Sequence, residues 1–144
     1  MTSGRLLLIP VPITEGDPAG TLPSSTLEAA RGCTRFLAEN AKSARAFLKA
    51  AGHPKPISKL EIVEIGHVPD EAHFAEWLAP VLEGRDTAIV SESGCPAVAD
   101  PGAGLVKAAQ SMGIEIVPFV GPSSILLTLM ASGMNGQRFR FLGY

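Results

Sequence analysis

The stretch TAIVSESGCPAVADPGAGLVKAAQSMGIEIVPF, residues 87–119, decides the fold because it contains one complete strand–helix–strand unit. Residues 87–91 form a short apolar run that is typical of a buried strand. Residues 105–112 have helical periodicity, which Gly113 terminates, and a second apolar run follows at residues 114–119. A helix between two such strands predicts a βαβ unit with parallel strands and a right-handed crossover.

The same alternation of strand-like and helix-like segments continues toward both ends of the chain. Further strands are expected at residues 5–11, 33–39, 60–65 and 138–142, and further helices at residues 26–31, 41–51, 69–82 and 125–131. The sequence therefore predicts an α/β fold, with a mainly parallel sheet of about five strands flanked by helices.

Three helices carry more detailed predictions. Ser24 and Ser25 are expected to cap the first helix, and Ser123 or Ser124 to cap the last. The last helix is almost wholly apolar, which predicts burial on most of its sides. In the helix at 69–82, the apolar stripe Phe74, Trp77, Leu78, Val81 and Leu82 is expected to face the core.

The length of 144 residues fits one ordinary domain, and 46% hydrophobic residues provide enough material for its core. We expect residues 1–136 to form this α/β domain. The segment 137–144 has no helix after it, so it either ends the domain or begins a second one.

Composition and motifs exclude several classes of protein. The net charge of −2 argues against a strongly basic, general nucleic-acid binder, although a local basic patch stays open. Cys33 and Cys95 lie far apart without a CxxC motif, so neither a disulfide framework nor a zinc site is expected, and no metal is predicted. No P-loop, GxSxG elbow or membrane-length apolar run occurs, and we expect a cytoplasmic protein without a membrane partner.

Three unusual loops follow predicted strands, at residues 12–23, 92–104 and 121–124. In parallel sheets, ligands bind beyond the carboxyl ends of the strands, so this convergence predicts a small-molecule site. Glu39, Glu92 and Asp100 lie near the same edge and are candidates for a general base. They are equally able to cap helices or to pair with basic residues. The three histidines are expected to be surface or loop residues.

The stretch Ser91–Gly133, with its loop SESGCPAVADPG and turn GPSS, resembles the tetrapyrrole methylase superfamily of S-adenosylmethionine (SAM) dependent methyltransferases. It is most similar to the ribosomal RNA small-subunit methyltransferase I branch, which carries SDAG-x-P-x-x-SDPG, PGPS and FxFLG segments. The start LLLIPVPI and the close FRFLGY extend this resemblance over nearly the whole chain. Glu39-Asn40-Ala41-Lys42 departs from the acidic-Asp-Thr-Arg turn of that branch.

The resemblance implies that this chain is the N-terminal domain of a two-domain enzyme, with SAM bound between the domains. The implied cofactor contacts are Pro12, Ile13, Gly94, Cys95, Val98, Ser123 and Ser124. It also implies a homodimer and, as acceptor, a ribose 2′-hydroxyl of small-subunit ribosomal RNA. A hydroxyl acceptor needs a base, which the sequence does not identify.

Two other functions stay open at this point. One is SAM-dependent methylation of a small molecule such as a tetrapyrrole, which the acidic net charge favours. The other is a binding or assembly module without catalysis.

Overall fold

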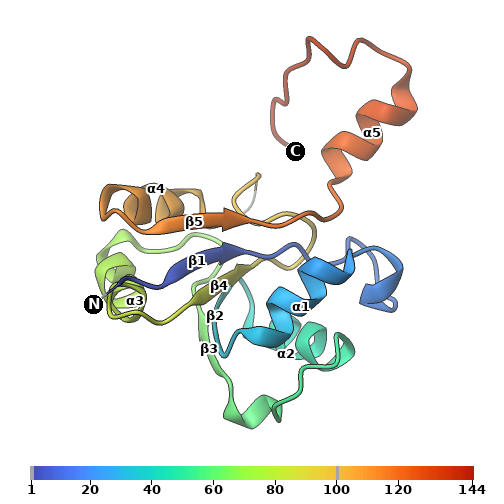
Figure 1. Cartoon of the computed structure of the whole chain (residues 1–144). Helices are drawn as coiled ribbons and strands as arrows, with labels where there is room; N and C mark the ends of the chain where they lie inside the picture. The colour runs from blue at the N-terminus through green and yellow to red at the C-terminus, as the bar shows by residue number, and fades with distance from the viewer. Residues whose placement is uncertain (1, 100) are drawn as a thin grey trace.

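The computed structural model describes residues 2–99 and 101–144 and shows a three-layer α/β arrangement (Figure 1). Five parallel strands form one sheet in the order β3-β2-β4-β1-β5. The strands are β1 (Arg5–Leu8), β2 (Arg35–Ala38), β3 (Glu61–Glu64), β4 (Thr87–Val90) and β5 (Glu115–Pro118). The predicted fold class is therefore confirmed.

Within the described residues, four α-helices and three short 3₁₀ turns lie between these strands, and a fifth α-helix follows the last strand. The helices are α1 (Ser24–Gly32), α2 (Ala41–Ala50), α3 (Phe74–Leu82), α4 (Ala103–Ser111) and α5 (Ser124–Ser132), and the 3₁₀ turns are η1 (Pro18–Gly20), η2 (Ile57–Lys59) and η3 (Glu71–His73). No helix among the described residues is both long and apolar enough to cross a lipid bilayer.

Two hydrophobic clusters hold the layers together, one on each face of the sheet. On one face, Phe36 of β2 packs with Leu27 of α1 and Leu48 of α2. On the other face, Leu37 of β2 packs with Leu78 of α3 and Leu105 of α4. Because successive residues of a strand point to opposite faces, Phe36 and Leu37 anchor both clusters from one strand.

The order of the strands creates a topological switch point between β1 and β4. These two strands are neighbours, with Leu7 opposite Ala88. The chain leaving β1 enters α1 on one face of the sheet, whereas the chain leaving β4 enters α4 on the other face. The two connections therefore lead to opposite faces of the sheet, and the edge beyond such neighbouring strands is where ligands bind in open α/β folds.

The structure corrects two helix predictions near the amino end and in the middle of the chain. Pro23, and not a serine, occupies the N-cap of α1, which has no capping side chain because Ser24 already lies inside the helix. In α3, Trp77 is buried as predicted, but Leu82 is 41% exposed because it ends the helix beyond the packed stripe.

The helix α5 is the largest departure from the sequence analysis. Ser123 caps it as predicted, but none of its residues is buried, and Met130 is 77% exposed. In Figure 1 it stands away from the sheet, whose two faces already carry α1–α2 and α3–α4. The predicted burial was wrong because an apolar composition shows that a helix is stabilised by burial but does not show which surface would cover it.

The strand predicted at residues 138–142 is also absent from the described part of the chain. These residues are exposed and irregular, and they lie beside no strand of the sheet. A β-strand needs a neighbouring strand to bond its backbone groups, and here none is within reach. The separate prediction that residues 137–144 begin a second domain stays a prediction.

Candidate functional site

Three loops meet beyond the carboxyl ends of β1, β4 and β5. The loop after β1 joins the loop after β4 through a two-way backbone bridge: Val11 N donates to Gly94 O at 3.0 Å, and Gly94 N donates to Val11 O at 3.1 Å. The hydroxyl of Ser93 also donates to the carbonyl of Ile13 at 3.3 Å. The contact between these loops, which was predicted from their positions after parallel strands, is thus direct.

The loop after β5 closes the third side of the site. The thiol of Cys95 donates to the carbonyl of Pro122 at 3.3 Å, which ties the β4 loop to the turn before α5. Thr26 of α1 donates from its hydroxyl to the carbonyl of Val120 at 2.6 Å and holds the same turn from the other side. Gly121 packs against the ring of Pro10, in a space too narrow for a side chain.

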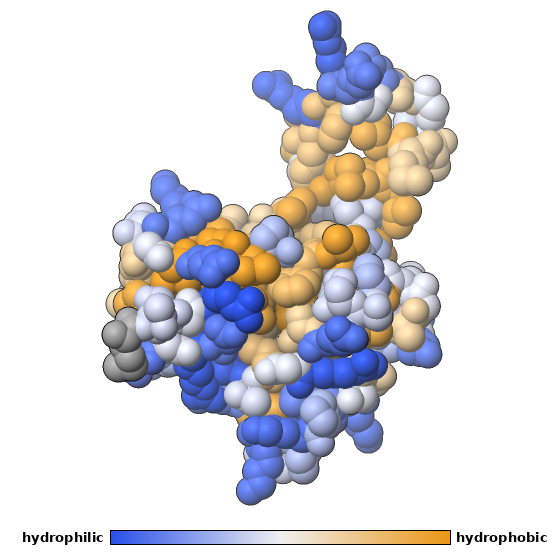
Figure 2. Space-filling model, viewed as in Figure 1, coloured by the Kyte–Doolittle hydropathy of each residue, from blue (hydrophilic) through white to orange (hydrophobic). Residues whose placement is uncertain are grey.

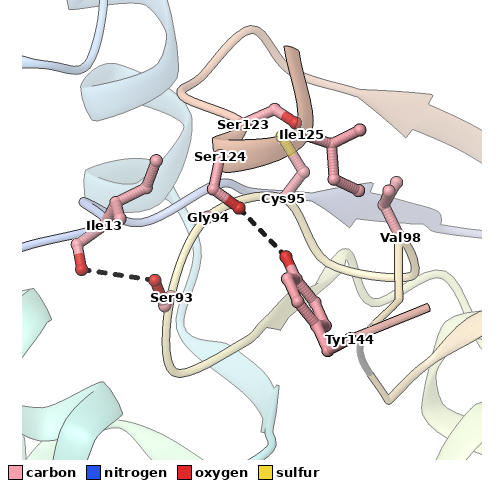
Figure 3. Close-up of a pocket in the computed structure, with 9 residues that line it drawn as sticks. All are labelled: Ile13, Ser93, Gly94, Cys95, Val98, Ser123, Ser124, Ile125 and Tyr144. Carbon is pink, nitrogen blue, oxygen red and sulfur yellow. Dashed lines mark hydrogen bonds between the residues drawn. The ribbon is translucent and has the colours of Figure 1, made fainter. Parts of the chain in front are cut away.

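A cavity of about 290 Å³ lies where the three loops meet (Figure 3). Six of the seven residues that the resemblance implied as cofactor contacts line it, and these are Ile13, Gly94, Cys95, Val98, Ser123 and Ser124. Three further residues that were not predicted also line it, and these are Ser93, Ile125 and Tyr144. The hydroxyls of Ser124 and Tyr144 lie 2.9 Å apart at its rim.

The seventh residue, Pro12, lines a neighbouring cavity of about 460 Å³ instead. Ile13 borders both cavities, so they adjoin along the loop after β1. Glu92 and Ala46 of α2 also line this second cavity.

The backbone of the β4 loop is held in unusual conformations. Ala97 and Ala99 have φ angles of +68° and +56°, in the left-handed region that side chains with a Cβ seldom occupy. Gly94 shares this region at φ +71°, and an added Cβ would lie 3.4 Å from the carbonyl of Pro122. Backbone of this kind concentrates at binding sites, where the surrounding structure holds it in place.

A cluster of titratable side chains lies beside these cavities, at the carboxyl ends of β3, β2 and β4. Glu39 is 7% exposed, and its Oε1 accepts from the backbone N–H of Glu92 at 3.1 Å. Its Oε2 lies 2.7 Å from Nδ1 of His67, whose side chain is 72% exposed. Polar atoms of Glu39, His67 and Glu92 all lie within 4.8 Å of one another.

This cluster brings together two of the three predicted base candidates and adds one residue that was missed. Asp100, the third candidate, lies outside the described residues. His67 carried no motif, although its position after a predicted strand was a usable signal. Two carboxylates and an imidazole can take up a proton or a divalent cation. The prediction that the protein has no metal therefore stays a prediction.

Comparison with known proteins gives one consistent result. No family model matches the chain. The chain is 32% identical over 144 residues to the ribosomal RNA small subunit methyltransferase I of Xylella fastidiosa (strain Temecula1), with 99% of this chain and 50% of the relative covered. The enzyme of the same name from Escherichia coli O157:H7 is 31% identical over 99% of this chain and 47% of its own length.

A third relative gives the same result. The Thermotoga maritima enzyme of that name is 29% identical over 98% of this chain and 60% of its own length. The chain thus spans about half the length of the curated relatives it matches. The resemblance stated from the loop motifs is confirmed over nearly the whole chain.

Proposed function

We propose that this homologue of the ribosomal RNA small subunit methyltransferase I enzymes is the SAM-binding, N-terminal part of an RNA-modifying methyltransferase. The observation that carries the proposal is the meeting of the three loops at one cavity, on the edge of the sheet where the switch point lies. The relatives' shared name supplies the reaction class. The proposed domain comprises residues 1–136, with 137–144 leading into a second domain.

The residues at the cavity suit a ligand with both polar and apolar parts. Val98 and Ile125 offer apolar side chains, whereas Ser123 and Ser124 offer hydroxyls. Gly94 lets a ligand approach the backbone because it has no side chain. The cavity of about 290 Å³ and its neighbour of about 460 Å³ together provide room of the size that cofactor sites have.

Bound SAM would supply a methyl group already activated by its sulfonium. The protein then has to align the acceptor, exclude water and remove the proton of an acceptor hydroxyl. We assign the removal of this hydroxyl proton to Nε2 of His67. The other ring nitrogen, Nδ1, is engaged by the buried carboxylate of Glu39 at 2.7 Å. That carboxylate stabilises the imidazolium that forms, and its other oxygen is held by the N–H of Glu92. Glu39 acts here as a positioning residue.

Calorimetry of the full-length protein with SAM tests cofactor binding. Val98→Trp fills the cavity from a half-exposed position and should abolish the binding heat, whereas Val68→Trp, at a fully exposed position outside it, should not. Equal binding by both variants, or no heat from a folded wild-type protein, would reject the site.

Methyl transfer to ribosomal RNA tests the base. General-base catalysis contributes about 10²–10⁴-fold, so His67→Ala should lower kcat by about that factor while SAM binding stays intact. Glu39→Gln keeps an acceptor for the N–H of Glu92 and should also lower kcat, with KM nearly unchanged. An unchanged kcat in both variants rejects the assignment and leaves the cofactor site standing.

The remaining parts of the proposal follow from the resemblance alone. They are a ribose 2′-oxygen of small-subunit RNA as the acceptor, a homodimer and a cytoplasmic location. Mass spectrometry of ribosomal RNA from a deletion strain, searching for one missing methyl group, tests the acceptor. Light scattering of the purified protein tests the dimer.

A further inference from the structure

The positive charge of this acidic protein is concentrated in one part of its sequence. Residues 31–59 contain seven of the twelve lysines and arginines of the chain. Of the fourteen aspartates and glutamates, only Glu39 lies in this segment. Two of these arginines already have partners within the protein: the buried Arg35 pairs with Glu61, and the exposed Arg31 donates to the carbonyl of Ala51. The other five cations lie on α2 and on the connection to β3.

These five residues face solvent without acidic partners. Lys42, Arg45 and Lys49 occupy one side of α2 at helical spacing, and Lys55 and Lys59 follow in the connection. All five are exposed, and none forms an ion pair with an acid among the residues that the structure describes. Figure 2 shows hydrophilic residues gathered at the lower end of the molecule, where Figure 1 places α2 and the connection to β3.

A cavity of about 540 Å³ opens between the end of α2 and this connection. Arg45, Lys49 and Lys55 supply its positive charge; we call this cavity the basic groove. His53 shapes its wall: Nδ1 of the ring accepts from the N–H of Lys55 at 3.1 Å, and Nε2 lies 2.7 Å from the carbonyl of Cys33. Both ring nitrogens of His53 are thus engaged by backbone groups. The positive charges of Arg45, Lys49 and Lys55 therefore favour an anionic ligand that enters the groove from solvent.

The basic groove is connected to the proposed methyl-transfer site by shared walls. Ile13 borders both the proposed cofactor cavity and the adjoining cavity. Ala46 borders that adjoining cavity and the basic groove. A chain-like ligand can therefore run from the methyl-transfer site across α2 and into the groove.

The ligand that fits this path is a polyanion with regularly spaced charges. Lys42, Arg45 and Lys49 extend along about 10 Å of helix, which exceeds the size of one phosphate group, and Lys55 and Lys59 continue the row. Arg and Lys contacts to successive phosphates fix the position of a nucleic acid without reading its sequence.

We propose that the basic groove and the adjoining face of α2 bind the sugar–phosphate backbone of single-stranded RNA next to the nucleotide that is methylated. The proposal rests on the proposed function and adds where the substrate lies. The phosphates on one side of the reactive nucleotide contact Lys42, Arg45 and Lys49. Because these contacts are electrostatic, they provide affinity and salt dependence, and base recognition is left to other surfaces.

Fluorescence anisotropy of the full-length protein with a labelled single-stranded RNA tests the groove. Lys49→Ala and Arg45→Ala should each weaken binding by about threefold to tenfold and reduce the slope of log affinity against log salt by about 0.7 per lost contact. Lys107→Ala is the matched control, because Lys107 is exposed on α4, over the opposite face of the sheet, and its loss changes the net charge equally.

Equal loss of RNA affinity in Lys49→Ala and Lys107→Ala would overturn the proposal. It would also be overturned if the wild-type protein bound anionic lipid vesicles through Lys49 but did not bind RNA. Circular dichroism confirms that each variant is folded. Calorimetry with SAM separates this proposal from the previous one. Loss of RNA binding with intact SAM binding supports the groove. Failure of SAM binding in the wild-type protein, with RNA binding that still depends on Lys49, rejects the cofactor site alone.

Discussion

Gly121→Ala tests whether close packing between two loops shapes the proposed site. The added Cβ would overlap the Cβ of Pro10 and lie 2.5 Å from its Cγ, with Leu22 at 3.5 Å behind. The proline ring cannot rotate away, so the two loops have to separate. Because the φ angle of Gly121 is not in the left-handed region, the substitution adds steric overlap without backbone strain.

The expected cost follows from overpacking, which typically destabilises a protein by about 1–3 kcal/mol. With a urea m-value of about 2 kcal/mol/M, a cost of about 2 kcal/mol lowers the unfolding midpoint by about 1 M. The same displacement moves the turn that carries Ser123 and Ser124, so SAM binding should weaken in calorimetry as well.

Gly20→Ala provides the control, because an added Cβ at Gly20 meets no atom within 4 Å. Its unfolding midpoint and SAM binding should remain within error of the wild-type values. If Gly121→Ala behaves like Gly20→Ala in both measurements, the packing of Pro10 against Gly121 does not shape the site, and the reasoning is wrong.

Two further predictions concern titratable groups. Burial raises the pKa of Glu61, but hydrogen bonds from the two arginines that contact it outweigh this and lower the pKa overall. Because the pKa of Glu61 is lower in the folded state, its ionised carboxylate stabilises the protein at pH values above the unfolded pKa of about 4.3. This stabilisation is lost as the pH falls through the folded-state pKa. Glu61→Gln should therefore lower the urea midpoint at pH 7 and flatten its decline in acid. Glu71→Gln should change neither, because Glu71 is exposed and forms no ion pair with any residue that the structure describes. An unchanged decline in Glu61→Gln contradicts the linkage. Burial raises the pKa of the Cys33 thiol, so a thiol reagent should label the half-exposed Cys95 first in the native protein, and SAM should slow that labelling; rapid labelling of Cys33 would contradict the burial.

The sequence predicted the sheet well because its strands are short apolar runs separated by clear helix signals. Thr87–Val90 and Glu115–Pro118 lie within the ranges expected from residues 87–119, and α2 begins at Ala41 as predicted. These features depend on local spacing and on residues that end helices, both of which a single sequence shows.

The two largest errors, the burial of α5 and the strand at residues 138–142, concern what lies outside an element and not the element itself. The helix α5 formed where its periodicity placed it, but its burial depends on a partner surface that periodicity does not specify. The segment 138–142 has the composition of a strand, yet a strand exists only when another strand lies beside it. Met130 is 77% exposed and Leu142 is 84% exposed for the same reason: the sequence shows that they are apolar but not which surface would cover them.

The basic groove was not predicted, because the net charge was counted over the whole chain. A net charge of −2 argues against general nucleic-acid binding, but it averages an acidic majority with one basic segment. In the structure, α2 and the connection to β3 keep that segment together on the surface, where Lys49 and Lys55 line one cavity. Charge counted by element would have found it, because helical spacing alone places Lys42, Arg45 and Lys49 on one side.

The cluster around Glu39 was beyond the sequence for a different reason. Glu39 and His67 are 28 residues apart in number, and they meet because β2 and β3 are adjacent and parallel, with Ala38 opposite Glu64. Glu92 joins them because β4 pairs with the other side of β2. Strand order, and not spacing along the chain, therefore selects which polar residues meet at the edge. A sequence that reveals where each strand ends reveals the candidates for a catalytic group, while their combination is decided by the order of strands in the sheet.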